Sequence, residues 1–267
     1  MSIRERSTLR DCVYGLAVGD ALGVPYEFCS RGSFSCMGMV GYGAHHQHAG
    51  TWSDDTSMTL ATCDSIRVRG SVDTADMLFR FRSWIEEGEY AIDSAVFDFG
   101  GTTACALATG VGCSGERDNG NGSLMRIAPL AFTNATDDEI RAVSAITHAH
   151  PISTTACVEM VHIMRALVAG AELAEGVSDY EALRAASEKD IRSGGFVRDT
   201  FRAALWCLAV TESYEECVLC AVNLGDDADT TAAVAGALAG IVYGIEGIPG
   251  IWLSTLRGTD IIDACLF

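Results

Sequence analysis

The sequence predicts an all-α protein, a compact orthogonal bundle of many helices that forms one domain over residues 1–267. Three observations favour this fold class. Apolar residues recur at helical spacing along most of the chain, only 4 of the 267 residues are prolines, and runs of β-branched residues with a period of two are absent. Hydrophobic residues make up 49% of the chain, which is enough to form a sizeable core.

Several of the expected helices begin with a Ser, Thr or Asp, whose side chain can accept a hydrogen bond from a free backbone N–H group of the first turn. Helical periodicity after such starts defines ten segments. In chain order these are Thr8–Val24, Ser57–Arg69, Thr74–Glu87, Thr102–Val111, Asp137–His148, Pro151–Ala169, Asp179–Lys189, Asp199–Thr211, Tyr214–Leu224 and Thr230–Gly244.

The first and the last of these helices carry glycines at every fourth position. The glycines are Gly15, Gly19 and Gly23 in the first helix and Gly236, Gly240 and Gly244 in the last. Residues four apart share one helix face, and each glycine costs about 1 kcal/mol relative to Ala inside a helix. We therefore expect both helices to pack closely in the centre of the fold, which would bring the loops beside them together.

Composition narrows the functional classes. The net charge of −18 argues against a nucleic-acid surface and is compatible with binding hard cations such as Mg²⁺. The N-terminus does not resemble a signal peptide, and the apolar segment 232–245 is shorter than a membrane span, so a cytoplasmic protein is expected. The eleven cysteines, including the pair Cys217 and Cys220, are expected to be reduced. No exposed apolar stripe identifies a partner or an oligomeric state.

Two clusters of acidic and hydroxyl residues carry the strongest functional signal. The first is Ser53-Asp54-Asp55-Thr56, and the second runs from Asp226 to Thr231; each directly precedes an expected helix. Either cluster alone is better explained by helix capping than by metal binding. Together they contain more carboxylates than capping requires, and carboxylate and hydroxyl oxygens are typical ligands of hard cations.

The charge count favours a site for two divalent cations. If Asp54, Asp55, Asp227 and Asp229 converge, their negative charges raise one another's pKa values. Two divalent cations supply four compensating positive charges, as in the two-metal sites of many hydrolases.

Five segments, in this order along the chain, resemble those of the ADP-ribosylglycohydrolases, the family that includes dinitrogenase reductase-activating glycohydrolase and the ADP-ribosyl-arginine and ADP-ribosyl-serine hydrolases. The segments are Gly19-Asp20-Ala21-Leu22-Gly23 with Glu27, Trp52-Ser53-Asp54-Asp55-Thr56, Gly120-Asn121-Gly122-Ser123-Leu124-Met125-Arg126, Thr147-His148 and Asp226-Asp227-Ala228-Asp229-Thr230. Each motif is weakly specific alone, but five in order across nearly the whole chain are quite specific.

The resemblance implies an all-α fold and a dinuclear centre that holds two Mg²⁺ or Mn²⁺ ions. Its implied ligands are Ser53, Asp54, Asp55, Asp227, Asp229 and Thr230. Glu27 matches the family's acidic residue near the metals and the scissile bond; a solvated loop carboxylate is the alternative. Water activated by the metals would attack an oxocarbenium-like carbon. Proton transfer is assigned to Glu27 or Asp55, and the sequence does not decide between them.

The segment from Asp98 to Thr102, including Gly100, resembles the family's Asp-x-Gly segment beside the distal ribose. Because a planar guanidinium favours a bidentate carboxylate partner, Asp98 indicates an arginine-linked substrate; a helix N-cap is the alternative role. Further substrate contacts are implied for Gly120, Asn121, Gly122 and Ser123, whose backbone can approach a diphosphate, for His148 near the ribose, and for Phe196 against adenine, although a core position suits Phe196 better.

Two features do not follow the family pattern directly. Asp226 stands where the family commonly has a glycine, which adds a carboxylate and bears on substrate preference and metal affinity. The trio His45, His46 and His48 lacks partner ligands at a spacing typical of zinc sites. We interpret it as a mobile loop near the substrate entrance.

The expected function is hydrolysis of the N- or O-glycosidic bond of an ADP-ribosylated protein, most directly at arginine. Serine-linked, nucleic-acid-linked and small-molecule ADP-ribose conjugates remain alternatives. A non-catalytic ADP-ribose-binding protein, such as the crystallin relatives of this family, and another two-metal hydrolase, such as a phosphoesterase, are the rival classes.

Overall fold

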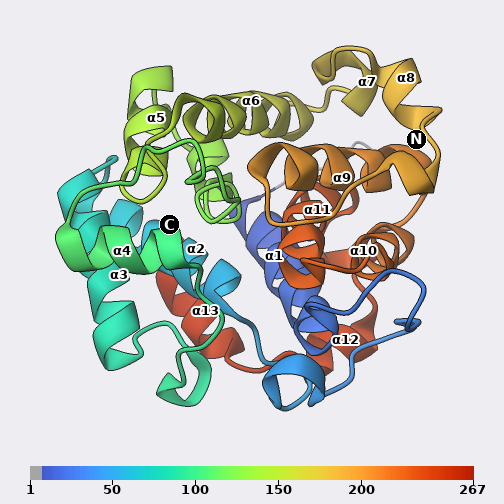
Figure 1. Cartoon of the computed structure of the whole chain (residues 1–267), viewed down its shortest axis with the longest axis horizontal. Helices are drawn as coiled ribbons and strands as arrows, with labels where there is room; N and C mark the ends of the chain where they lie inside the picture. The colour runs from blue at the N-terminus through green and yellow to red at the C-terminus, as the bar shows by residue number, and fades with distance from the viewer. Residues whose placement is uncertain (1–7) are drawn as a thin grey trace.

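The computed structural model describes residues 8–267, and within them it contains helices and three isolated β-bridges but no β-strand. The prediction of an all-α fold is confirmed. The α-helices, shown in Figure 1, are α1 (Leu9–Gly23), α2 (Asp54–Arg69), α3 (Thr74–Glu87), α4 (Gly101–Thr109), α5 (Asp137–Ala145), α6 (Pro151–Val168), α7 (Leu173–Gly176), α8 (Tyr180–Arg184), α9 (Val197–Val210), α10 (Tyr214–Asn223), α11 (Ala228–Tyr243), α12 (Gly250–Thr255) and α13 (Thr259–Cys265).

Helices α1 and α11 lie side by side in the centre, surrounded by the others (Figure 1). A Cβ atom added at Gly15 would stand 2.3 Å from the backbone oxygen of Gly236, and one at Gly19 would stand 2.1 Å from that of Ala232. The glycines are therefore required for this close approach, as the sequence predicts. Gly244 differs from the prediction: it has a φ of 74° and ends α11 instead of continuing the stripe.

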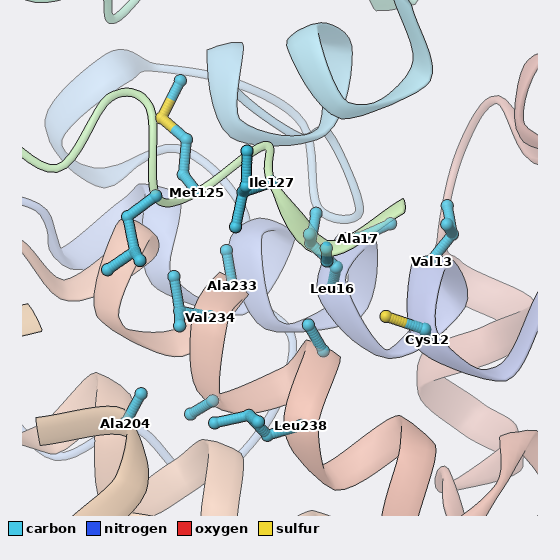
Figure 2. Close-up of a cluster of buried hydrophobic side chains, with 14 of the residues drawn as sticks. Cys12, Val13, Leu16, Ala17, Met125, Ile127, Ala204, Ala233, Val234 and Leu238 are labelled. Atoms are coloured by element: carbon cyan, nitrogen blue, oxygen red, sulfur yellow. The ribbon is translucent and has the colours of Figure 1, made fainter. Parts of the chain in front are cut away.

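The same contact reaches the second acidic cluster. A Cβ atom added at Gly23, the last residue of α1, would stand 2.2 Å from the Cα atom of Asp229. Around the helix pair, Leu16 and Ala17 of α1 and Ala233 of α11 belong to the buried apolar core, with Ile127 above them (Figure 2). The loops at these helix ends are therefore held in place by the core.

Several helix boundaries differ from prediction. Helix α2 begins at Asp54, three residues early, because Ser53 is its N-cap and the two aspartates occupy its first turn. Helix α5 ends at Ala145, because the backbone turns there and the Ser144 hydroxyl donates to the carbonyl of His148. The helix predicted over 179–189 is a single short helix, α8, followed by a 3₁₀ turn at Glu188–Asp190.

Three helices of four to seven residues were not predicted: α7, α12 and α13. Helical periodicity cannot identify segments of one or two turns. In addition, none of the helices in residues 8–267 combines the length and the apolar character that crossing a bilayer requires.

Candidate active site

The first acidic cluster lies in the first turn of α2. The hydroxyl of Ser53 accepts a hydrogen bond from the backbone N–H of Asp55 at 3.3 Å. The carboxylate of Asp20, from α1, accepts the backbone N–H groups of Ser53 and Thr56 at 2.9 and 3.0 Å, and the Thr56 hydroxyl at 2.6 Å. Because Ser53 and Asp20 satisfy the free amides, the carboxylates of Asp54 and Asp55 are not needed as caps.

The second acidic cluster lies at the start of α11. Asp227 occupies the N-cap position, but its side chain accepts no capping hydrogen bond. Its Oδ2 atom instead accepts from the Asn121 side chain at 2.9 Å. The hydroxyl of Thr230 donates to Asp55 Oδ1 at 3.3 Å, which joins the two clusters. Asp55 and Thr230, which are 175 residues apart in the sequence, are therefore in contact, as expected.

Three carboxylate oxygens in these clusters are buried and have no hydrogen-bond partner within residues 8–267: Asp55 Oδ2, Asp227 Oδ1 and Asp229 Oδ2. One oxygen each from Asp20, Asp55 and Asp229 lie within 4.8 Å of one another. Burial, followed by the neighbouring carboxylates, raises the pKa values of Asp55 and Asp229 well above their ordinary value. Unpartnered, mutually repelling oxygens of this kind suit divalent cations. The positive charge of a bound cation offsets the free-energy cost of burying charged carboxylates next to one another.

A cavity of about 310 Å³ opens beside the clusters. The sequence-predicted residues that line it are Glu27, Asp54, Asp98, Gly100, Thr102, Gly120, Asn121, Gly122, His148, Asp227 and Thr230. Of the other predicted residues, Ser53, Asp55 and Asp229 are buried and do not line it, and Ser123 and Phe196 lie outside it. The cavity is thus bordered by both acidic clusters.

Glu27 is buried at the cavity wall, which excludes the alternative of a solvated loop carboxylate. Its carboxylate is hydrogen-bonded to the Nε2 atom of His45, and the same nitrogen lies 3.8 Å from Asp98 Oδ2. Burial raises the pKa of Glu27 to about 7, while the bond to His45 opposes this shift. The hydrogen bond to Glu27 raises the pKa of His45. Glu27 can therefore hold or release a proton near neutral pH.

Asp98 has an unusual backbone conformation, and it does not cap a helix. Its φ of 53° lies in the left-handed region, which few residues other than glycine adopt. The N-cap of α4 is Gly100, without a side-chain capping bond, so the N-cap alternative for Asp98 does not apply. The carboxylate instead faces the cavity near Glu27.

The loop at 120–123 approaches His148 closely. A Cβ atom at Gly122 would stand 2.8 Å from the imidazole Cε1 atom, so only a glycine fits there. Among residues 8–267, the backbone N–H groups of Gly120 and Gly122 have no protein acceptor, which leaves them available to a ligand. Ser123 is fully buried, and its hydroxyl is engaged with Ser144 and Cys157, so this side chain does not reach the cavity.

Two predicted residues have a different environment from the one expected. Phe196 is 42% exposed and is the N-cap residue of α9, so it is neither in the core nor at the cavity, although its neighbour Gly195 lines it. Asp226 is exposed with a φ of 58°. Its side chain therefore adds no fifth carboxylate to the buried clusters, and its backbone adopts the conformation that suits the glycine common at this position.

Sequence reasoning did not assign two residues that the site uses. Asp20 bridges α1 to the first cluster, and the signal that could have identified it is one carboxylate within the otherwise apolar stretch 13–24. His45 lies in a 3₁₀ turn, half-buried against Glu27, whereas His46 and His48 are exposed. No sequence spacing links His45 to Glu27 or Asp98, because the three meet only through the fold.

Comparison with known proteins shows the family to which this chain is similar. Residues 1–266 match the family model of the ADP-ribosylglycohydrolases. An ADP-ribosylarginine hydrolase Tri1 from Pseudomonas putida is 34% identical, over 95% of this chain and 75% of its own length. The ADP-ribosyl-[dinitrogen reductase] glycohydrolase of Rhodospirillum rubrum is 33% identical, over 91% of this chain and 87% of its own. A solved structure of an ADP-ribosylglycohydrolase-related protein complex superposes with a TM-score of 0.79 at 33% identity, covering 96% of this chain and 94% of that one.

Proposed function

The chain belongs to the ADP-ribosylglycohydrolase family, and on this premise we propose that it cleaves the glycosidic bond between ADP-ribose and a protein arginine. The observation that carries the proposal is the convergence of the two acidic clusters at one cavity, with Asp98 and Glu27 on its wall. Two neighbouring carboxylates suit a planar guanidinium. The names of the relatives from Pseudomonas putida and Serratia proteamaculans, both ADP-ribosylarginine hydrolases, support the same linkage.

We further propose that two Mg²⁺ or Mn²⁺ ions are held by Ser53, Asp54, Asp55, Asp227, Asp229 and Thr230. All of these donors are oxygens, which favours hard cations over softer metals. The buried, unpartnered oxygens of Asp55, Asp227 and Asp229 support the assignment. When bound, such ions stabilise developing negative charge and lower the pKa of water.

Protein groups supply the remaining steps of the proposed reaction. Glu27 lines the cavity and its pKa lies near 7, whereas Asp55 is fully buried and accepts from Thr230. Glu27 is therefore the better candidate to move a proton between water and the leaving group. Asp98 would orient the guanidinium, and the free amides of Gly120 and Gly122 would face the diphosphate. We propose that residues 1–267 act as one domain, which the continuous apolar core supports.

The test is to incubate the protein with an arginine-ADP-ribosylated protein, with Mg²⁺ or with EDTA, and to detect free ADP-ribose by mass spectrometry. We expect release only with metal, and much slower release from Asp98→Asn. Asp226→Asn, which alters an exposed carboxylate beside the site, is the matched control and should behave as the unaltered protein. Release from a serine-linked or small-molecule conjugate but not from the arginine-linked one would overturn the linkage and leave the reaction class standing.

A further inference from the structure

Arg126 is a fully buried residue that the proposed reaction does not use. Its guanidinium lies over the ring of Phe81, with Cζ 4.5 Å from the ring centroid. It donates to the carbonyl of Val143, and its Nη2 atom donates to the Thr147 hydroxyl at 2.8 Å. Among residues 8–267 no carboxylate forms an ion pair with it. Burying a guanidinium cation among neutral acceptors costs free energy, so the position of Arg126 calls for an explanation.

The hydroxyl of Thr147 connects Arg126 to the cavity. Its Oγ1 atom has two partners, Arg126 Nη2 and, at 2.9 Å, the Nδ1 atom of His148. A guanidinium can only donate hydrogen bonds, so Oγ1 is the acceptor toward Arg126. The hydroxyl hydrogen is then directed to Nδ1. If Nδ1 carried its own hydrogen, Oγ1 would face two donors and its hydrogen would have no acceptor among the described residues.

The imidazole of His148 is neutral in this environment. Burial, followed by the positive charge of Arg126, lowers the pKa of His148 to about 4. Its second nitrogen, Nε2, has no protein partner within residues 8–267, and the side chain lines the cavity. Nε2 lies 3.3 Å from the Cβ position that Gly120 lacks, beside the free amides of the glycine-rich loop.

We propose that Arg126 and Thr147 are positioning residues that fix the tautomer of His148, so that Nδ1 accepts from Thr147 and the Nε2–H group points into the cavity as a permanent donor. His148 then recognises an oxygen acceptor of the ligand, together with the amides of Gly120 and Gly122. It is not available there as a base. The identity of that oxygen, on the ribose or diphosphate of ADP-ribose, rests on the proposed function; the tautomer does not.

The tautomer is measured directly by ¹⁵N–¹H NMR of the histidine side chains in the unliganded protein. We expect His148 to be Nε2-protonated and unchanged from pH 6 to pH 8. Thr147→Val removes the donor to Nδ1 and should introduce the Nδ1-protonated form, whereas Thr147→Ser should retain the original tautomer. Thr62→Val is the control, because the Thr62 hydroxyl bonds only a carbonyl of its own helix. An Nδ1-protonated His148 in the unaltered protein would overturn the proposal. This measurement does not depend on whether any variant folds.

Turnover gives a second measurement. A hydrogen bond made equally to the bound substrate and to the transition state affects KM, so Thr147→Val should raise KM about five- to tenfold with kcat little changed. Thr147→Ser should restore KM. An unaltered KM in a Thr147→Val protein with a changed tautomer would contradict the ligand contact. If no ADP-ribosyl conjugate is cleaved while NMR finds the Nε2–H form, the proposed function fails and the tautomer assignment stands.

Discussion

The N-termini of α2 and α11 carry similar Asp and Thr residues, yet their backbone N–H groups are satisfied differently. At α2, Ser53 caps its own helix and Asp20 reaches in from α1 to accept two more amides. At α11, the N-cap residue Asp227 makes no capping bond with its side chain. Both arrangements leave carboxylate oxygens unpartnered, Asp55 Oδ2 in the first and Asp227 Oδ1 and Asp229 Oδ2 in the second.

The comparison separates capping from ligand binding. Helix capping explains Asp20 and one of the two acceptor lone pairs of the Ser53 hydroxyl, because these oxygens are hydrogen-bonded to amides; the second lone pair of Ser53 stays available to a cation. It does not explain buried oxygens with no donor, which cost free energy in the absence of a cation.

Replacing both Asp227 and Asp229 by Ala should abolish turnover, a loss on the order of 10³-fold or more. The reason is that the variant cannot hold the ions that stabilise the transition state electrostatically. The fold should remain, since Asp227 makes no capping bond with its side chain, Asp229 accepts only the backbone N–H of its neighbour Thr230, and mutual repulsion is relieved. Steady-state kinetics and circular dichroism check both statements. Full activity in this variant would eliminate the metal assignment.

Asp20→Asn alters the cap of the first cluster. Asn keeps one acceptor oxygen where Asp20 serves the Ser53 and Thr56 amides and the Thr56 hydroxyl. We expect a loss of about 1–3 kcal/mol in the free energy of unfolding with metal bound, and activity about 10–100-fold lower because the metal-binding turn is misplaced. Chemical denaturation and kinetics measure the two effects. Unchanged activity would mean that Asp20 serves the fold alone.

The stability of the metal-free protein should fall as pH rises. Asp54, Asp55 and Asp229 have folded pKa values well above the ordinary 3.8, so the folded state retains protons that the unfolded state releases. The free energy of unfolding therefore decreases with pH above the unfolded pKa values. In EDTA we expect a lower Tm at pH 8 than at pH 5, by calorimetry. The carboxyls with lowered pKa values, such as Asp73, stabilise the fold equally at pH 5 and pH 8, and they lose this contribution only as the pH falls through their own pKa values.

Mg²⁺ or Mn²⁺ should raise the Tm more at pH 8 than at pH 5, because binding requires deprotonated carboxylates. At a free metal concentration of about 100 times Kd, binding increases the free energy of unfolding by about 2.7 kcal/mol. An equal gain at both pH values would indicate that the ions bind elsewhere.

Asp226→Gly should have the smallest effect. The side chain is exposed and the φ of 58° suits glycine, so the free energy of unfolding should change by less than about 1 kcal/mol. Metal affinity, measured by titration calorimetry, should not change. A marked change in affinity would place Asp226 in the metal-binding cluster after all.

Much of the fold could be predicted from the sequence, because long helices carry their signal locally. The periodicity of 74–87 predicts α3 to the residue, and the glycine stripes predict the contact of α1 with α11. The short helices α12 and α13 carry too few turns for such a signal. The two acidic clusters also stand out, because each is continuous in sequence and precedes a helix.

Only the tertiary structure decided which side chain does what within the site. Asp20 could not be assigned by its motif, because its role depends on amides 33 and 36 residues away. His45 meets Glu27 and Asp98 across three separate segments, and Ser123 turns away from the cavity despite its place in a glycine-rich loop. Helix formation depends on neighbours within a few residues, whereas hydrogen bonding and charge at a buried site depend on atoms that only packing brings together.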